Sequence, residues 1–421
     1  MPEQHVQAAQ GSCEGVDLGA LAQREGTPLY VYSASAIRDR LHALQAALEG
    51  CDAGICYAVK ANSNGAILRL LGEQGAGADI VSGGELRRAL QAGIPAERIV
   101  FSGVGKSADE IHQALDAGVA RFNLESRAEL DLLQSLAAAR GDIARASVRI
   151  NPDVDAQTHA KISTGKSENK FGVSVAEARA WFAAHERWSA VQLDGLHMHI
   201  GSQILSMEPL RQALQRMAAF WRELDAAGHA IASIDVGGGL GVRYREGEQA
   251  IAADAYVAEI RAALDGFQGR ILLEPGRWLL AEAGILLSRV LLEKRGESRR
   301  FLVLDAAMND LLRPSLYDAW HDIVRIGSEV RPQVAYDIVG PICETGDTFA
   351  VGRGLPRCDA GDLVAILGAG AYGASMASSY NSRPLLAEVL VDGDRYAVVR
   401  RRQTFDEMIT GEQPANDWRQ A

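Results

Sequence analysis

Residues 56–92 read CYAVKANSNGAILRLLGEQGAGADIVSGGELRRALQA, and this stretch carries the pattern that decides the fold. It contains two apolar, strand-like runs, CYAVKAN at 56–62 and DIVS at 79–82. Each run is followed by a segment in which apolar residues recur at three- and four-residue steps, which is typical of a helix with one buried face. The stretch therefore predicts two consecutive β/α units.

The same alternation continues to residue 277. Six further strand-like runs lie at 99–103, 122–126, 148–152, 195–201, 234–239 and 272–277. Between them are helical patterns such as Ala128–Ala139, Leu210–Ala226 and Ala255–Leu264. Eight strands that alternate with helices indicate an α/β fold, an eight-stranded parallel (β/α)8 barrel of the TIM type.

The pattern changes at both ends of this barrel. TPLYVYS at 27–33 predicts a short strand, and Ser33 can cap a helix that runs to Gly50. From Gly284 onward the apolar runs are β-like, and VDGD at 391–394 fits a hairpin turn. We expect an N-terminal segment at 1–34 that packs with the β domain, a barrel at 35–283 and a mostly β C-terminal domain at 284–421.

Size and composition are those of an ordinary soluble protein. The chain has 421 residues, of which 48% are hydrophobic, so it can bury a large core. A net charge of −11 argues against nucleic-acid binding, because such proteins concentrate positive charge. We expect a cytoplasmic protein, since no apolar run or signal pattern predicts a membrane segment or export. The five scattered cysteines predict free thiols.

Reactive side chains stand at the C-terminal ends of the predicted strands, where TIM barrels place their active sites. Lys60 is alone in the apolar first strand, although lysines are ordinarily solvated. A lysine that extends from the barrel mouth into water is the structural alternative. Burial would lower the pKa of Lys60 and make it the amine nucleophile that a Schiff base requires.

Two further strand ends point to the same edge of the barrel. LEPGR at 273–277 ends strand eight, which lies beside strand one in a closed barrel. We therefore expect Glu274 near Lys60, where the two residues either act in catalysis or form a simple ion pair. DVGGGLG at 235–241 ends strand seven, and its three consecutive glycines let backbone amides approach a phosphate. The alternative interpretation of these glycines is a plain turn. A dinucleotide loop is disfavoured because no helix follows immediately.

HMHIGSQ at 197–203 places His197 and His199 on one strand face. We expect no metal there, because no nearby carboxylate or cysteine completes a ligand set. A flat imidazole could instead lie on a cofactor ring and leave Ser202 for a phosphate. In PICETGD at 341–347, Cys343 stands beside Glu344, and it is either a small buried apolar side chain or a proton donor.

Six motifs in order resemble those of the fold-type III pyridoxal-phosphate decarboxylases, over about residues 26–410. They are YAVKAN, HMHIGSQ, DVGGGLG, LEPGR, PICETGD and GAYG at 370–373. STGKSENKFGV at 163–173 and DAAMNDLLRPSLYDAW at 305–320 are similar to the diaminopimelate decarboxylases among them. THAKISTG at 158–165 departs from the family pattern, since Ala160 and Lys161 replace a proline and an aromatic residue.

The resemblance implies a role for each matching residue. Lys60 holds pyridoxal 5′-phosphate, Glu274 meets its pyridine nitrogen, and His199 stacks on its ring. The other cofactor-binding residues, most of them around the phosphate, are Ser202, Gly237, Gly238, Gly239, Pro275, Gly276, Arg277 and Tyr372. The residues expected to bind substrate are Arg277, Arg313 and Tyr317 at a distal carboxylate, Glu344 at a distal ammonium, and Tyr372. Cys343 is the proton donor and comes from the partner subunit, which implies a homodimer with shared active sites.

The implied reaction is decarboxylation of meso-2,6-diaminopimelate to L-lysine and carbon dioxide, the last step of lysine biosynthesis. A carboxylate clamp with one acid for an amine fits a small molecule that has an amino-acid group at each end. Two alternatives are a related decarboxylase for another basic amino acid or a siderophore or polyamine precursor such as carboxynorspermidine, and a non-catalytic regulatory homologue. Arg313 with Glu344 argues against the first, and retention of Lys60, Glu274 and Cys343 against the second.

Overall fold

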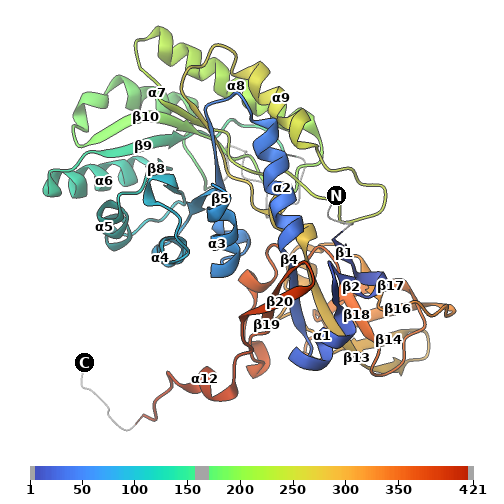
Figure 1. The fold of residues 1–421 in the computed structure, drawn as a ribbon. Helices are drawn as coiled ribbons and strands as arrows, with labels where there is room; N and C mark the ends of the chain where they lie inside the picture. The colour runs from blue at the N-terminus through green and yellow to red at the C-terminus, as the bar shows by residue number, and fades with distance from the viewer. Residues whose placement is uncertain (1–4, 157–169, 416–421) are drawn as a thin grey trace. The chain divides into compact units, whose positions relative to one another are not determined.

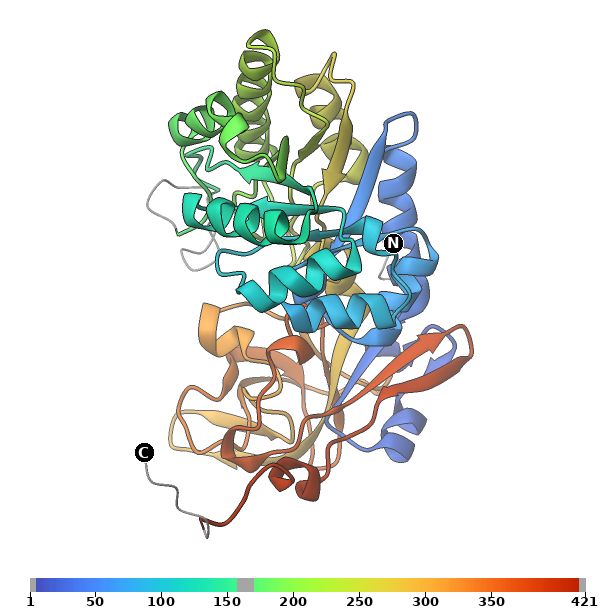
Figure 2. The ribbon, with the colours of Figure 1, turned by 90° about the vertical axis from the view of Figure 1, so that its left-hand side faces the viewer.

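The computed structural model describes residues 5–156 and 170–415. Ala160, Lys161 and most of the 163–173 motif lie outside the described residues. The chain divides into two compact units, which are drawn in Figures 1 and 2. The first contains Ser33–Gly284 and Gly370–Ser375, and the second contains Gln7–Tyr32, Ile285–Ala369 and the residues from Met376 onward.

The first unit is built on a closed barrel of eight parallel strands, counted over the described residues. β12 pairs with β5 and so closes the ring, which confirms the predicted (β/α)8 barrel. Most strands end a few residues earlier than the sequence suggests, so the expected site residues mostly follow the strands. The strands are β5 Ala53–Ala58, β6 Gly77–Ile80, β7 Ile99–Phe101, β8 Arg121–Leu124, β9 Ala144–Arg149, β10 Val191–His197, β11 Ser233–Asp235 and β12 Arg270–Leu273.

Helices surround this barrel, as Figures 1 and 2 show. They are α2 Ala34–Ala47, α3 Gly65–Glu73, α4 Gly83–Gln91, α5 Ala108–Ala117, α6 Arg127–Arg140, α7 Val175–Ala183, α8 Met207–Ala226, α9 Ala253–Ala263 and the short α10 Arg277–Leu280. Ser33 caps α2 as predicted, because its side chain accepts from the backbone N–H of Ala36 at 3.0 Å. Ile37 and Leu41 of this helix are fully buried, so its apolar stripe anchors it.

The second unit is mostly β, as expected. Its described residues form a nine-stranded sheet in which β13 pairs antiparallel with β14 and β18, and the turn after Asp392 joins β19 to β20 as predicted. The strands are β4 Leu29–Ser33, β13 Gly284–Arg295, β14 Arg300–Leu304, β15 Ile323–Arg325, β16 Gln333–Val339, β17 Thr348–Pro356, β18 Leu363–Ile366, β19 Ala387–Asp392 and β20 Arg395–Arg400. A small sheet contains β1 Val6–Gln7, β2 Ser12–Cys13 and β3 Val16–Asp17. The remaining described α-helices are α1 Leu18–Glu25, α11 Arg313–Tyr317 and α12 Phe405–Ile409.

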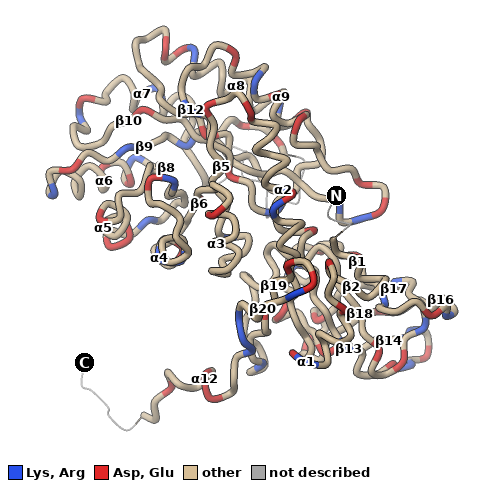
Figure 3. Tube along the Cα trace, in the orientation of Figure 1, with Lys and Arg blue, Asp and Glu red and all other residues tan. Residues whose placement is uncertain are grey.

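Charged residues of both signs are interspersed along the chain (Figure 3). Within residues 5–156 and 170–415, every helix is too short or too polar to cross a membrane. The five cysteines are free thiols in this part of the chain.

Candidate active site

Lys60 lies in a short 3₁₀ turn, Val59–Ala61, directly after β5. Its Nζ donates a hydrogen bond to the Asp79 carboxylate at 3.0 Å, and Asp79 is buried near the end of the neighbouring strand β6. The lysine side chain itself is 39% exposed. The amine therefore lies against a buried acid and still has open space beside it.

The pKa of Lys60 differs from the sequence expectation. Burial lowers this pKa as expected, but the charges of Asp79 and Glu274 raise it above its ordinary value. The expectation of a lowered pKa was therefore wrong for the chain by itself, because two acids at the barrel mouth favour the ammonium form of Lys60. The lysine must lose a proton before it can bond to an aldehyde, and Asp79 is the group that it already contacts.

Glu274 follows β12 and is the centre of a buried hydrogen-bond network. Its Oε1 accepts from Asn123 at 3.3 Å and from Ser102 at 3.4 Å, and its Oε2 lies 3.2 Å from Nε2 of His197. Burial alone would raise the pKa of Glu274, but His197 and Lys60 outweigh it and hold this pKa well below its ordinary value. Glu274 is therefore ionised and able to pair with a protonated ring nitrogen.

Asp235, at the end of β11, is the second carboxyl of this network. The potential ligand atoms of His197, Asp235 and Glu274 lie within 4.8 Å of one another. Burial and the charge of Glu274 raise the pKa of Asp235 well above its ordinary value, so the two acids are not both ionised. The sequence reading that no carboxylate stands near these histidines was wrong, because both acids come from the next two strands around the barrel.

The loop after β11 contains glycines at positions where a Cβ atom would overlap neighbouring backbone atoms. A Cβ on Gly237, whose φ is +70°, would come 2.2 Å from the Met198 carbonyl oxygen, and one on Gly238 would come 2.2 Å from that of Glu274. The backbone N–H of Gly238 donates to Nδ1 of His199 at 3.2 Å. Burial, Arg149 and Lys60 lower the pKa of His199 well below its ordinary value, so this imidazole is neutral.

Arg277, the first residue of α10, contacts two other expected site residues. Its Nε and Nη2 donate to Ser202 Oγ at 3.3 and 3.2 Å, and its guanidinium lies 4.7 Å from the centre of the Tyr372 ring. Tyr372 is held by its backbone N–H, which donates to the Ala61 carbonyl at 2.7 Å. Ser202, Arg277 and Tyr372 thus meet beside the turn that carries Lys60.

Pro275 and Gly276 connect this group to β5. The Pro275 carbonyl accepts from the N–H of Ala58 at 3.1 Å, and a Cβ on Gly276 would meet Ala58 and Ala61 at 3.0 Å. The structure therefore brings together the expected barrel residues Lys60, His199, Ser202, Gly237, Gly238, Gly239, Glu274, Pro275, Gly276, Arg277 and Tyr372 at one end of the barrel.

Replacing Gly237 by alanine should damage both stability and cofactor binding. Gly247→Ala is a matched control, because Gly247 also has a positive φ, +87°, but nothing within 4 Å of its position for a Cβ. The control should cost about 1–2 kcal/mol of unfolding free energy for its backbone conformation. Gly237→Ala should cost about 2 kcal/mol more and weaken pyridoxal-phosphate binding at least tenfold. Urea unfolding and fluorescence titration measure both, and equal effects in the two variants would contradict a packed glycine loop.

The remaining expected residues lie in the second unit. Arg313 in α11 is buried, and its Nη1 donates to Nε2 of His321 at 2.8 Å, while Tyr317 ends the same helix. Glu344 is exposed and accepts from the hydroxyl of Tyr380 at 2.8 Å. Ser315 ties α11 to the Cys343–Glu344 loop, because its hydroxyl donates to the Gly346 carbonyl at 2.6 Å.

Cys343 is exposed, and its backbone N–H donates to Oδ1 of Asn381 at 3.2 Å. The alternative interpretation of Cys343 as a small buried apolar side chain was therefore wrong. An exposed thiol on a loop tied down by two neighbours remains available to a substrate or to another subunit.

Comparison with known proteins shows the family to which the chain is similar. A family model described as the pyridoxal binding domain of pyridoxal-dependent decarboxylases matches residues 34–281. The diaminopimelate decarboxylase of Zymomonas mobilis is 46% identical over 404 residues, which cover 95% of this chain and 96% of the relative. That of Pseudomonas aeruginosa is 49% identical over 403 residues, with 95% and 96% covered. The chain belongs to the diaminopimelate decarboxylase family.

Solved structures agree with this membership. Diaminopimelate decarboxylase from Helicobacter pylori, complexed with L-lysine, is 45% identical to the chain, has a TM-score of 0.91 and is matched over 94% of this chain and 98% of its own. The lysine/ornithine decarboxylase of Vibrio vulnificus complexed with putrescine is more distant, with 25% identity, a TM-score of 0.77 and coverages of 89% and 96%. The cofactor of the family is pyridoxal phosphate, as the resemblance implied.

The residues at the barrel mouth fit that cofactor. The chain offers an amine at Lys60, an ionised carboxylate at Glu274 and a neutral imidazole at His199. It also offers a glycine loop without side-chain obstruction, together with the Ser202 hydroxyl. These groups match the aldehyde, ring nitrogen, ring face and phosphate of pyridoxal phosphate.

Proposed function

We propose that this chain catalyses decarboxylation of meso-2,6-diaminopimelate to L-lysine and carbon dioxide, the last step of lysine biosynthesis. The observation that carries the proposal is the cluster of Lys60, Asp79 and Glu274 at the mouth of the barrel, in a chain that matches diaminopimelate decarboxylases over nearly their whole length. Bound pyridoxal phosphate supplies the conjugated ring that accepts the electron pair left when carbon dioxide departs.

The chain's own barrel residues would prepare the site for that chemistry. The negative charge of Glu274 favours a proton on the pyridine nitrogen, and the hydrogen bonds from Asn123 and Ser102 keep its carboxylate in place. His199, held neutral, can lie on a ring face without adding charge. We propose that Lys60 holds the cofactor and that Ser202, Gly237–Gly239, Pro275, Gly276, Arg277 and Tyr372 surround it, mainly at the phosphate.

We further propose that Arg277, Arg313 and Tyr317 take the distal carboxylate of the substrate, with Tyr372 nearby, and that Glu344 takes its distal ammonium. Two guanidiniums suit a carboxylate, because their N–H groups can pair with both of its oxygens. A substrate without the distal carboxylate, such as ornithine, would leave the buried guanidinium of Arg313 without that partner. Recognition of both distal groups explains a preference for diaminopimelate.

Arg313→Ala and Glu344→Ala should each weaken use of diaminopimelate. Each change leaves a charged group of the bound substrate unpaired, which should lower kcat/KM by an amount equivalent to about 2–5 kcal/mol. Cofactor binding, followed by its absorbance, should be unchanged. Arg331→Ala is a control in the same unit, because Arg331 pairs with Glu329 and Asp362 and has no assigned site role. Normal kinetics in Arg313→Ala or Glu344→Ala would remove that residue from the proposed clamp.

We propose that the enzyme is a cytoplasmic homodimer in which Cys343 of one subunit serves the active site of the other as proton donor. The exposure of Cys343 supports this, since a donor that crosses between subunits must lie on the surface of its own chain. The five free thiols suit a reducing compartment.

A substrate panel tests the proposed reaction. Purified protein with pyridoxal phosphate should release carbon dioxide from meso-diaminopimelate and form one lysine for each carbon dioxide. Ornithine, arginine, lysine and carboxynorspermidine should react at a small fraction of that rate. Faster turnover of any of these four would reassign the substrate, and no release from any compound would favour a non-catalytic homologue.

A further inference from the structure

A cavity of about 510 Å³ opens at the end of the barrel opposite Lys60. Its lining comes from the first residues of the parallel strands, including Gly54 in β5, Gly77 in β6, Ser233 in β11 and Arg270 in β12. The residues of the candidate active site instead follow the last residues of the same strands. This cavity is therefore separate from the proposed active site.

Small residues stand at two interior positions of the barrel that line the cavity. Side chains alternate along a strand, so the residue two positions before an inward-facing site residue also faces inward. Gly77 stands two positions before Asp79, and Ser233 two positions before Asp235. TIM barrels usually fill such positions with bulky branched side chains. Ser233 leaves space in this layer, whereas a Cβ on Gly77 would come 2.0 Å from the Arg98 carbonyl oxygen, so glycine there permits the close approach of Arg98.

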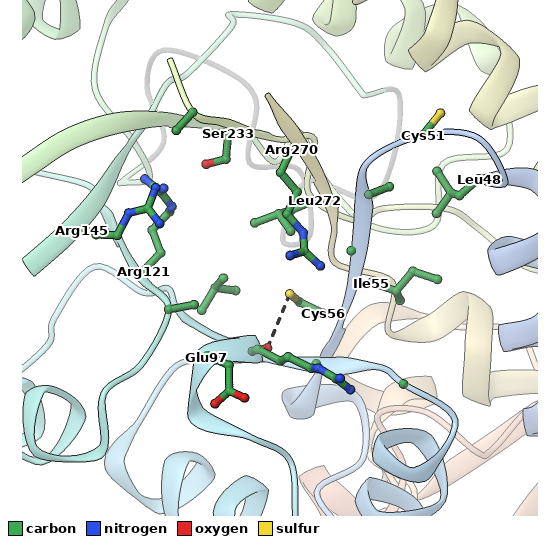
Figure 4. A pocket seen from close by; sticks show the side chains of 18 of the residues that line it. Leu48, Cys51, Ile55, Cys56, Glu97, Arg121, Arg145, Ser233, Arg270 and Leu272 are labelled. Atoms are coloured by element: carbon green, nitrogen blue, oxygen red, sulfur yellow. Dashed lines mark hydrogen bonds between the residues drawn. The ribbon is translucent and has the colours of Figure 1, made fainter. Parts of the chain in front are cut away.

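Four arginines line this space, Arg98, Arg121, Arg145 and Arg270. Arg121 and Arg145 share a single carboxylate, Asp194, at 2.5 and 2.9 Å. Figure 4 shows the guanidinium groups of Arg121, Arg145 and Arg270 around the cavity.

The other two arginines are less well neutralised. The nearest acid to Arg270 is Asp52 at 3.9 Å, and the side chain of Arg98 makes no ion pair with any other residue that the structure describes. Among the described residues that line the cavity, Glu97 is the one acidic residue. Such a local excess of positive charge, in a chain with a net charge of −11, favours an anionic ligand.

The inner wall adds an apolar surface and an unused hydroxyl. Cys56, Val100 and Leu272, from β5, β7 and β12, form a buried apolar cluster that also lines the cavity. Ser233 is 4% exposed, and its Oγ has no hydrogen-bond partner, although buried hydroxyls normally have one. The cavity thus combines guanidinium groups, one available hydroxyl and an apolar wall.

We propose that this cavity binds a small aliphatic carboxylate. The arginines pair with the carboxylate, the hydrocarbon part packs on Cys56, Val100 and Leu272, and the Ser233 hydroxyl supplies one hydrogen bond. Its volume lies within the range of about 300–1,000 Å³ that is usual for sites of small ligands. The proposal goes beyond the decarboxylation, because none of these residues has a part in it.

Calorimetric titration of the holoenzyme with succinate tests this site. One saturable site per chain is expected, and Arg270→Gln should weaken succinate binding at least tenfold. Arg179→Gln is the matched control, since the side chain of Arg179 is 50% exposed and that of Arg270 55%, but Arg179 lies on α7 and pairs with Glu223. Arg313→Ala should leave the affinity unchanged, which separates this cavity from the proposed distal clamp.

Ser233→Ala provides a second variant with its own readout. It should weaken succinate binding several-fold without lowering the melting temperature, because the lost hydroxyl has no partner in the folded chain. Absence of saturable binding would overturn the proposal, as would loss of binding in Arg313→Ala with full binding in Arg270→Gln. Inorganic phosphate that binds as tightly as succinate would also overturn it, since only anion attraction would remain. Heat of binding is independent of carbon dioxide release, so failure here is distinguishable from failure of the proposed reaction.

Discussion

Lys60→Ala should lower the rate of decarboxylation at least about 10³-fold, the scale of loss seen when the group that bonds to a cofactor or substrate is removed. Lys60 is the amine that the structure places beside Asp79 and close enough to Glu274 for their charges to interact. If Lys60 holds the cofactor as we propose, the variant lacks the covalent attachment. Steady-state rates of carbon dioxide release, measured with saturating pyridoxal phosphate, give the size of the loss.

Lys60→Arg distinguishes the covalent role from a structural one. Arginine keeps the positive charge that faces Asp79, so the fold should be preserved, but its guanidinium does not bond to an aldehyde at neutral pH. We expect Lys60→Arg to be as inactive as Lys60→Ala, with a melting temperature closer to that of the wild type. Substantial activity in Lys60→Arg would mean that the lysine contributes only an ion pair.

The second large effect concerns Cys343. Cys343→Ala and Lys60→Ala chains should each be nearly inactive alone, because one lacks the proposed proton donor and the other the cofactor attachment. If the thiol serves the partner's site, a mixed dimer contains one site with both defects and one with neither. Random exchange of equal amounts makes half of the dimers mixed, so about a quarter of wild-type activity should return.

Carbon dioxide release after subunit exchange measures this recovery. Exchange itself is checked by mass spectrometry of differently tagged chains, and a mixture of Cys343→Ala with wild type controls for dilution. A thiol that acts within its own chain predicts no recovery, so persistent inactivity after confirmed exchange would refute the shared site.

The sequence predicts the barrel well because its strands and helices differ in period. The run CYAVKAN and the helical segment after it form one β/α unit. Because seven further units of the same pattern follow, only a few chain topologies are possible. The exact strand ends were less predictable. Lys60 lies in a 3₁₀ turn after β5, since the apolar run continues past the last residue that pairs with β6.

The polar network under the site was not predictable in the same way. Asp79, Ser102 and Asn123 lie within short apolar runs, where a single polar residue gives no sign of its partner. They meet because neighbouring strands place them on the same inward face, and this depends on the register of the closed barrel. The raised pKa of Lys60 has the same origin, because it depends on charges contributed by other strands.

Reduction with borohydride tests directly whether the amine of Lys60 at the barrel mouth carries pyridoxal phosphate, as we propose. The purified holoenzyme is reduced with borohydride, digested and mapped by mass spectrometry. We expect one pyridoxyl-phosphate group per chain, on the peptide that contains Lys60. A label on any other lysine, or no label on a protein that still releases carbon dioxide, would contradict it.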